Sequence, residues 1–198
     1  LSGDEKLIEI FKNGEDVHRG VASRVFSVPQ EDVTAEMRRR AKVINFGILY
    51  GMGVNSLKSS LGVSMNEAQT FHDDYFETFS ALAAYLESTK GFARKYGYTE
   101  TLFGRRRQFP EMKSPLPYVR AQAERMAINA PIQGTQSDII KLAMVKIDAM
   151  LTERGAQDDA HMLLQIHDEL VFEVRHARVA ELAPEIERIM ESILTPEE

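Results

Sequence analysis

Apolar residues recur every three or four positions along most of this 198-residue chain, which is the spacing of an amphipathic α-helix. Turn residues such as Asn13-Gly14 and Gly62 interrupt the pattern, and Thr34 and Ser64 are suited to begin helices. The predicted helices cover residues 4–11, 16–27, 34–51, 54–61, 64–96 with a bend near Ser80, 118–130, 135–153 and 177–194, with a break at Pro131-Ile132-Gln133-Gly134.

Two stretches have the pattern of strands instead. Residues 98–102 and 105–109 flank Phe103-Gly104, which predicts a small hairpin that carries three consecutive arginines. Residues 162–174 form two apolar arms that meet at His167-Asp168-Glu169, which predicts a tight hairpin without glycine in its turn. The predicted fold class is therefore α+β, mostly helical.

The helix predicted over residues 34–51 has two different faces. At about 100° per residue, side chains four apart form a slowly winding stripe. One such stripe consists of Arg38, Lys42, Phe46 and Tyr50, and the opposite, apolar face consists of Met37, Ala41, Ile44 and Ile48. Two cations followed by two aromatic rings suit the triphosphate, sugar and base of a nucleotide. From this helix alone the alternative stays open that Lys and Arg stems merely cover rings on a solvated surface.

Charge is distributed unevenly along the chain. Residues 34–60 contain five Lys or Arg and one acidic residue, residues 90–125 contain nine and three, and residues 153–198 contain four and twelve. The basic stretches indicate surfaces for a phosphate-rich partner such as DNA, although the net charge is −6. The absence of cysteine excludes disulfides and thiolate metal sites, and no apolar run has transmembrane length, so we expect a cytoplasmic protein without membrane contacts.

Two further clusters carry candidate chemistry. Asp168 and Glu169 are adjacent carboxylates at the tip of an apolar hairpin, and we expect them to lose hydration and to need a cation such as Mg²⁺. An aspartate in a turn is also common for structural reasons. Asn129 and Gln133 flank the predicted helix break, where they either cap the helices or read acceptors in the minor groove of a duplex.

Together these motifs resemble DNA polymerase family A over essentially the whole chain. The run Arg38-x-x-x-Lys42-x-x-x-Phe46-Gly47-x-x-Tyr50-Gly51 resembles the family's motif B, and Gln165-Ile166-His167-Asp168-Glu169 resembles its motif C. Three more segments are similar to the family in the same order: Asp16-Val17-His18-Arg19, Thr101-Leu102-Phe103-Gly104-Arg105-Arg106 and the stretch from Arg125 to Thr135.

The resemblance implies the architecture of a bacterial DNA polymerase I. Residues 1–30 would be helices that lead from palm to fingers, and residues 31–96 would be fingers with the nucleotide-binding helix at 34–51. Residues 97–198 would be the remainder of the palm, with the basic hairpin, the minor-groove helix and the motif C hairpin at 162–174.

The resemblance also implies a role for each motif residue. The residues that would bind the nucleotide are His18, Arg38, Lys42, Phe46 and Tyr50. Catalysis falls to Asp168, Glu169 and Lys42, with Asp168 as metal ligand and Lys42 placed to protonate the leaving pyrophosphate. DNA binding falls to Arg105, Arg106, Arg125, Asn129, Gln133 and His167. The implied reaction is template-directed nucleotidyl transfer by in-line attack with two Mg²⁺ ions, and the implied partners are primer–template DNA and dNTPs.

One feature of the family has no counterpart in these residues. Motif A carries the other metal-binding aspartate, and no Asp-Tyr-Ser-type stretch occurs here. We therefore expect a fragment that is inactive alone and needs the missing N-terminal part of the polymerase, with motif A and the thumb. The alternatives are a non-catalytic nucleic-acid-binding helical module and an RNA-copying relative. In the cell we expect a nucleoid-associated bacterial protein that acts in DNA replication or repair.

Overall fold

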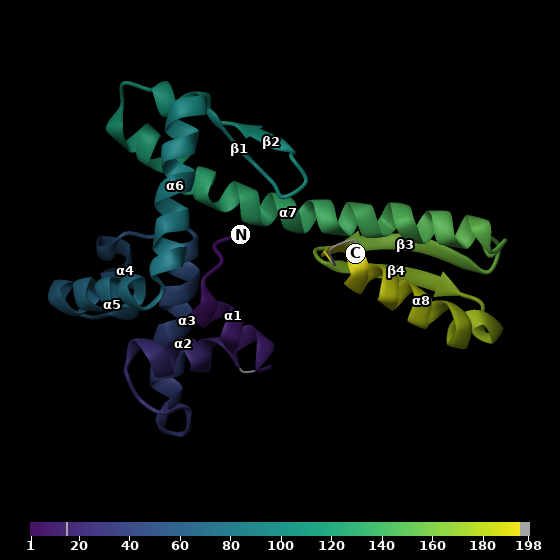
Figure 1. Cartoon of the computed structure of the whole chain (residues 1–198), viewed down its shortest axis with the longest axis horizontal. Coiled ribbons are helices and arrows are strands. Elements are labelled where there is room, and N and C mark those ends of the chain that lie inside the picture. The colour runs from purple at the N-terminus through teal and green to yellow at the C-terminus, as the bar shows by residue number, and fades with distance from the viewer. Residues whose placement is uncertain (15, 195–198) are drawn as a thin grey trace. The chain divides into compact units, whose positions relative to one another are not determined.

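A computed structural model describes residues 1–14 and 16–194 of the chain (Figure 1). The chain divides into two compact units, unit 1 with residues Leu1–Ile132 and unit 2 with residues Gln133–Glu198. Each unit has a hydrophobic core of its own. The fold is mostly helical with two small antiparallel hairpins, which confirms the predicted class.

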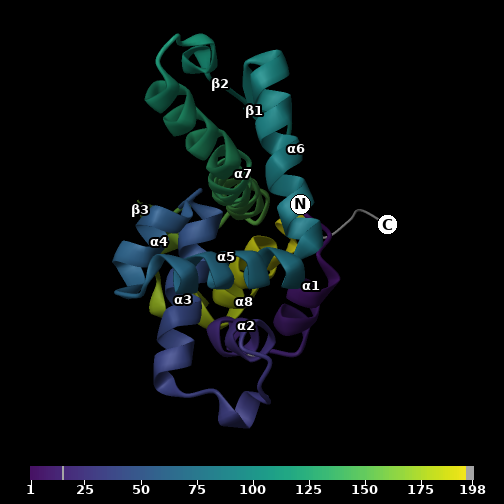
Figure 2. The same ribbon diagram turned by 90° about the vertical axis from the view of Figure 1, so that its left-hand side faces the viewer.

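Unit 1 is built from helices and one hairpin. Its elements are α1 (Glu5–Lys12), α2 (Val17–Val25), α3 (Ala35–Leu49), α4 (Val54–Leu61), α5 (Met65–Thr78), α6 (Ser80–Tyr96), β1 (Tyr98–Glu100), β2 (Arg106–Gln108), the first part of α7 (Pro117–Glu153), and 3₁₀ turns at Gln30–Asp32 and Pro110–Lys113. Helix α3 packs against α2, α4 and α5 (Figure 2). The fully buried side chains at the centre of this core include Ile44, Leu57, Tyr75 and Phe79.

Capping side chains begin the helices of unit 1 where the sequence predicts it. Thr34 accepts a hydrogen bond from the Met37 amide at the start of α3, and Ser64 and Glu67 form a capping box at the start of α5. Asp4 has two capping roles, because its Oδ1 accepts from the Leu7 amide of α1 and its Oδ2 accepts from the Leu82 amide of α6, at 3.2 and 3.1 Å. This buried carboxylate joins helices that are far apart in the sequence.

Helix α7 contradicts one sequence prediction. Separate helices over 118–130 and 135–153 were expected, but α7 runs from Pro117 to Glu153 with Pro131 inside it. A proline within a helix removes one hydrogen bond and crowds the preceding turn, at a cost of about 3 kcal/mol. Here Ala127, Ile128 and Ala130 in that turn are buried, and this packing offsets the missing bond.

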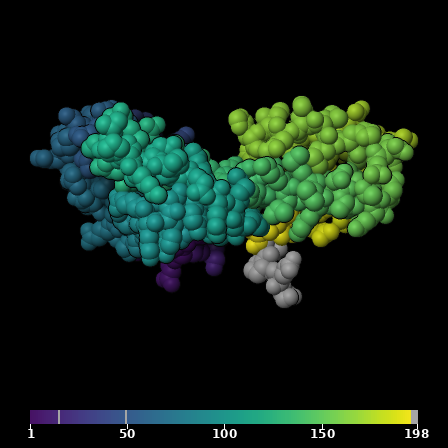
Figure 3. Space-filling model, turned by 90° about the horizontal axis from the view of Figure 1, so that it is seen from above, coloured from purple at the N-terminus to yellow at the C-terminus, as the bar shows by residue number. Residues whose placement is uncertain are grey.

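Unit 2 consists of the remainder of α7, a hairpin and a helix. Strand β3 (Ala160–Ile166) pairs antiparallel with β4 (Glu169–Val174), and helix α8 (Val179–Glu191) follows, with 3₁₀ turns at His176–Arg178 and Ser192–Leu194. The hairpin confirms the predicted one, with an irregular register between Met162 and Leu164. Yellow-green atoms of the hairpin lie at the surface of unit 2 beside the green atoms of α7 (Figure 3).

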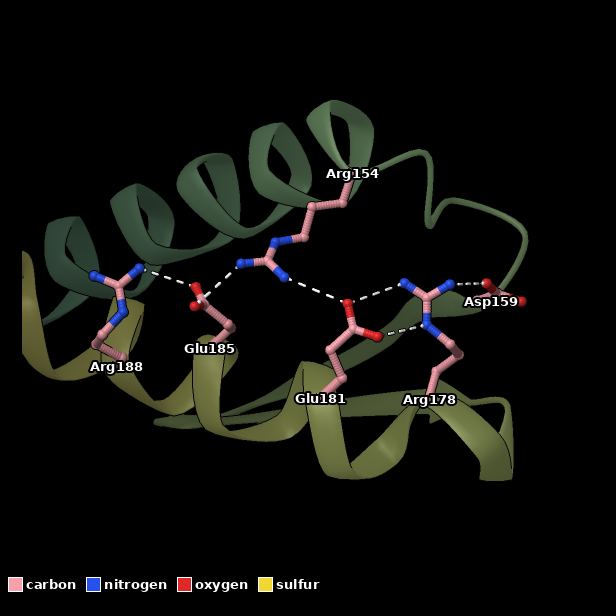
Figure 4. A network of polar contacts seen from close by, with 6 residues as sticks. All are labelled: Arg154, Asp159, Arg178, Glu181, Glu185 and Arg188. Atoms are coloured by element: carbon pink, nitrogen blue, oxygen red, sulfur yellow. Dashed lines mark hydrogen bonds and ion pairs between the residues drawn. The ribbon is translucent and has the colours of Figure 1, made fainter.

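A chain of ion pairs joins α7, the start of β3 and α8 (Figure 4). Arg154 at the end of α7 contacts Glu181 at 3.4 Å and Glu185 at 3.1 Å, both on α8. Arg178 contacts Glu181 at 3.0 Å and Asp159, before β3, at 2.8 Å. Several linked pairs fix the register of α8 more firmly than one exposed pair, which contributes at most about 1 kcal/mol.

Among the helices of the described residues, none is both long enough and apolar enough to cross a membrane.

Candidate functional site

The stripe predicted on the 34–51 helix is exposed in the structure. Lys42 is exposed, the Arg38 side chain is 41% exposed, and the rings of Phe46 and Tyr50 are 45% and 52% exposed. On the opposite face Ala41, Ile44 and Ile48 are buried. Helix α3 therefore rests on an apolar face and presents two cations and two large rings to solvent, as predicted.

One buried polar residue of α3 escaped the sequence analysis. Asn45 is 8% exposed, and its Oδ1 accepts a hydrogen bond of 2.7 Å from the Tyr75 hydroxyl of α5. Burial raises the pKa of Tyr75, so that the hydroxyl keeps its proton and remains a donor. The signal in the sequence was an amide between the apolar residues Ile44 and Phe46, although the helix period places Asn45 at the edge of the stripe and not on the face that was expected to be buried. This bond sets the position of α3 on the core.

Arg38 is held by a carboxylate at the start of α2. Its Nε and Nη2 atoms donate to Asp16 Oδ2 at 3.1 and 2.7 Å, while Asp16 Oδ1 accepts from the Arg19 amide at 2.9 Å and caps α2. The Arg38 guanidinium and then the Arg19 amide lower the pKa of Asp16 from 3.8 to about 2. Asp16 thus contacts the edge of the Arg38 guanidinium that carries Nε and Nη2.

His18 lies against the aromatic part of the stripe. Its ring is 5.4 Å from the Phe46 ring, centroid to centroid, and its buried Nδ1 has no hydrogen-bond partner within the described part of the chain. Burial lowers the pKa of His18, and Arg38 and Lys42 lower it further, against the opposite effect of Asp16. The His18 ring thus lies between α2 and the aromatic part of the stripe, close enough to Arg38 and Lys42 for their charges to affect its pKa.

A glycine at the end of α3 allows α7 to approach. Gly51 has φ +71°, and a Cβ atom on it would lie 2.7 Å from Cγ and 3.1 Å from Cβ of Arg125. Arg125 therefore lies beside the residue that follows Tyr50. One turn further along α7, the Asn129 side-chain amide donates to the Arg125 carbonyl at 3.1 Å. The structure thus brings Arg125 to the aromatic end of the stripe, with Asn129 one turn further along α7, within unit 1.

The structure confirms the predicted basic hairpin, in which β1 pairs with β2, and two contacts hold the side chain of Arg106. Arg106 donates from Nε to Glu100 at 2.6 Å, and its guanidinium carbon is 4.5 Å from the centre of the Tyr98 ring. Arg105 and Arg106 are both exposed. Exposed guanidinium groups on a short rigid hairpin suit contacts to phosphate.

The remaining predicted residues lie in unit 2. Gln133 is exposed on α7, and His167, Asp168 and Glu169 are exposed at the tip of the β3–β4 hairpin. His167 has φ +56°, and a positive φ at the first of two turn residues is the geometry of a type II′ turn. Gln165 supports the turn with a hydrogen bond of 3.2 Å to the His167 carbonyl. A histidine at this position is strained, and such strain is found preferentially at functional sites.

The acidic tip corrects one expectation. Asp168 and Glu169 were expected to lose hydration, but both side chains are exposed because the turn projects beyond the packed face of the hairpin. Across the described residues, no group of three or more His, Cys, Asp or Glu side chains is arranged to hold a metal. Mg²⁺ binds proteins through as few as one or two carboxylates together with water and substrate phosphates, and Asp168 with Glu169 fits that partial role.

The site residues thus divide between the units. Unit 1 contains His18, Arg38, Lys42, Phe46, Tyr50, Arg105, Arg106, Arg125 and Asn129, and unit 2 contains Gln133, His167, Asp168 and Glu169. Within unit 1 the structure brings together the α3 stripe, His18 and Arg125.

Comparison with known proteins covers nearly the whole chain. The profile of DNA polymerase family A matches residues 1–196. The chain is 48% identical over 193 residues to the thermostable DNA polymerase I of Thermus aquaticus, with 98% of this chain and 23% of that protein covered. It is 51% identical over 174 residues to DNA polymerase I of Mycobacterium tuberculosis, with 88% of this chain and 19% of that protein covered.

A solved structure shows the same fold. The POL domain of Pol1 from M. smegmatis, in complex with a DNA primer–template and dNTP, superimposes with a TM-score of 0.90 at 44% identity over 98% of this chain and 34% of that one. The chain spans about a fifth of the length of its curated relatives, which are bacterial. On these grounds the chain belongs to DNA polymerase family A.

Proposed function

We propose that this chain supplies the nucleotide-binding face and part of the catalytic centre of a DNA-directed DNA polymerase. The observation that carries the proposal is the α3 stripe, in which Arg38, Lys42 and Phe46 are exposed in order while the opposite face is buried. The related POL domain from M. smegmatis is known with primer–template DNA and dNTP bound, and it shares this fold.

The proposed nucleotide lies along α3. Arg38 and Lys42 bind the triphosphate, because a guanidinium and an ammonium group one turn apart neutralise adjacent phosphates. His18, whose ring lies against Phe46 beside the two cations, contacts the same phosphates. Phe46 packs on the sugar and Tyr50 lies beside the new base pair, and Lys42 also protonates the leaving pyrophosphate.

The proposed DNA contacts come from both units. Arg105 and Arg106 bind backbone phosphates from the basic hairpin. Arg125, Asn129 and Gln133 contact the minor groove of the primer–template duplex, where amide and guanidinium groups donate to base acceptors. His167 contacts the primer end.

Asp168 is the proposed metal ligand, with Glu169 as a second carboxylate nearby. When bound, two Mg²⁺ ions activate the primer 3′-hydroxyl and stabilise charge on the transferred phosphorus. The exposed position of Asp168 allows it to reach a metal that arrives with substrate. A single aspartate does not hold two ions, so the 198 residues are proposed to be inactive in polymerisation without an Asp-Tyr-Ser-type stretch.

The first experiment measures nucleotide binding by the chain itself. In equilibrium dialysis with Mg²⁺ and radiolabelled dNTP, we expect Lys42→Ala to weaken binding by roughly 10- to 100-fold, the effect of one charge-assisted contact. Lys58→Ala removes an exposed lysine from α4 and serves as the matched control. Equal binding by wild type and Lys42→Ala would contradict the proposal.

The second experiment separates a polymerase from a binding module. Primer extension is run on this chain and on a version extended N-terminally through motif A, and we expect activity in the extended protein only. A non-catalytic DNA-binding module would bind DNA without response to dNTP and Mg²⁺, and would extend no primer in either form. Extension by the short chain alone would show that another carboxylate replaces the missing aspartate.

A further inference from the structure

Three aromatic rings gather where α6 meets β1. Phe92 and Tyr96 lie in the last turns of α6, Tyr98 begins β1, and we call these three residues the α6–β1 aromatic cluster. Ring centroids are 4.6 Å apart for Phe92 and Tyr96, 5.3 Å for Phe92 and Tyr98, and 6.4 Å for Tyr96 and Tyr98. The ring planes are tilted by 46°, 86° and 48° in the same order, so the rings form one contiguous cluster with edge and face contacts.

The α6–β1 aromatic cluster is not part of a hydrophobic core. Phe92 is 36% exposed, Tyr96 is 50% exposed, and none of the three rings belongs to a cluster of buried side chains within the described residues. The buried side of α6 at this level is formed by Thr89 and Ala93. Contiguous aromatic surface left in water is typical of a binding surface.

The backbone holds the cluster in place. Gly97 has φ +78° and ends α6, with its amide bonded to the Ala93 carbonyl at 2.8 Å, so the chain reverses directly into β1. The Gly97 carbonyl accepts from the Phe109 amide at 2.7 Å, which closes the base of the β1–β2 hairpin. Tyr98 is therefore held beside the end of α6.

Cations lie over two of the rings. Lys95 Nζ is 4.9 Å from the Tyr96 centroid, and the Arg106 guanidinium carbon is 4.5 Å from the Tyr98 centroid. Glu100 holds Arg106 in this position by a hydrogen bond of 2.6 Å. Residues 90–108 contain six Lys or Arg and one Glu, a net charge of +5, whereas the whole chain has −6. The α6–β1 aromatic cluster is thus the aromatic centre of a basic surface.

We propose that the α6–β1 aromatic cluster binds single-stranded DNA, with bases against the exposed parts of the Phe92 and Tyr96 rings and backbone phosphates at Lys95 and Arg106. Stacking on aromatic rings beside cations is the usual way in which proteins bind a single strand without reading its sequence. A duplex fits less well, because its bases are already stacked on one another. The cluster uses none of the residues of the α3 stripe, so the inference is independent of the proposed nucleotide site.

The test uses a fluorescein-labelled oligothymidylate of about 15 nucleotides and the whole chain. By fluorescence anisotropy, we expect the double variant Phe92→Leu/Tyr96→Leu to bind it roughly five- to fiftyfold more weakly, since the loss of stacking for one base, partly offset by contact with leucine, falls in that range. Leucine keeps the apolar surface and helix propensity, and circular dichroism checks the fold. Tyr118→Leu removes a ring that is 68% exposed on α7 and is expected to leave affinity unchanged.

A second measurement locates the contact. An oligothymidylate with 5-iododeoxyuridine is photo-crosslinked to the wild-type chain with an excess of dNTP and Mg²⁺, which occupy the α3 site if the proposed function holds. Cross-links on Phe92, Tyr96 or Tyr98 that persist under this competition support the inference. Cross-links confined to Phe46 and Tyr50, or equal losses of affinity in Tyr118→Leu and the double variant, would overturn it and leave the proposed function untouched. Failure of dNTP to bind α3 would refute the proposed function without affecting the cross-links on this cluster.

Discussion

The exposed face of α3 in unit 1 and the exposed face of the β3–β4 hairpin in unit 2 are built from different kinds of residue. The exposed stripe on α3 consists of Arg38, Lys42 and Phe46, with Tyr50 directly after the helix, and these are the types that bind phosphate, sugar and base. On the hairpin they are largely aliphatic: Leu163, Leu164 and Ile166 are about half exposed, at 52%, 58% and 48%. The acidic residues Asp168 and Glu169 lie only at its tip.

The two faces also differ in how complete a binding site each unit contains. Helix α3 has its supporting contacts within unit 1: a buried bond from Asn45, an ion pair from Asp16 and a close approach by Arg125. The hairpin has one packed face, formed with α7 and α8, and the two carboxylates at its tip suit only a partial share in metal binding. We therefore expect nucleotide binding to be a property of unit 1, and catalysis to need more chain than unit 2 supplies.

The chain offers a direct way to observe unit 1 separately. All six tyrosines lie at or before residue 118 and there is no tryptophan, so intrinsic tyrosine fluorescence reports on unit 1 alone.

The largest effect is expected from Gly51→Ala. The methyl group would be 2.7 Å from Arg125 Cγ at a residue with φ +71°, so backbone strain and a clash close to the α7 backbone add together. We expect unit 1 to lose about 2–4 kcal/mol of unfolding free energy, measured by urea titration of tyrosine fluorescence. Gly104→Ala is the matched control, because Gly104 has φ +78° and open space around it, and its loss should be about 1 kcal/mol. Equal losses would show that the approach of Arg125 is unimportant.

Tyr75→Phe tests the buried hydrogen bond between Tyr75 of α5 and Asn45 of α3. It leaves the Asn45 carbonyl oxygen buried without its donor, for which we expect a loss of about 1–3 kcal/mol by the same measurement. The double variant Asn45→Leu/Tyr75→Phe should recover part of the loss, since no buried polar atom then lacks a partner. If Tyr75→Phe changed stability no more than Tyr118→Phe on the surface, the buried bond would not position α3.

The sequence predicts the stripe, the caps at Thr34 and Ser64 and both hairpins, because each depends on neighbouring residues and a fixed period. It does not predict contacts between elements. The Asn45–Tyr75 bond joins residues 30 positions apart, and the Asp4 carboxylate caps a helix 78 positions away. The uninterrupted α7 was missed for the same reason, since packing by Ala127 and Ala130 outweighs the local effect of Pro131.

Asp16→Asn separates charge from capping, because asparagine is as good an N-cap as aspartate. The side chains of Asp16 and Arg38 are each 41% exposed. Solvent therefore screens their ion pair, and we expect a loss of about 0.5–1 kcal/mol of unfolding free energy at pH 7. The pKa of Asp16 falls to about 2 on folding, so this contribution is complete above about pH 4 and disappears as the pH falls toward 2.

Urea titrations of both proteins at neutral and acidic pH check this expectation. The difference between wild type and Asp16→Asn should shrink on acidification, and Arg38→Met should abolish the effect of Asp16→Asn in the double variant. A difference that stays constant down to pH 2 would assign the loss to capping and not to charge.

The smallest effect concerns the hairpin turn. Glycine adopts φ +56° without strain, so His167→Gly should stabilise the turn by a few tenths of a kcal/mol, after the entropy of the unfolded glycine is counted. Asp168→Gly, at a residue without positive φ, should destabilise it. Amide hydrogen exchange at Ile166 and Glu169, which pair across the turn, should slow in the first variant and accelerate in the second. Acceleration in both would refute the turn geometry.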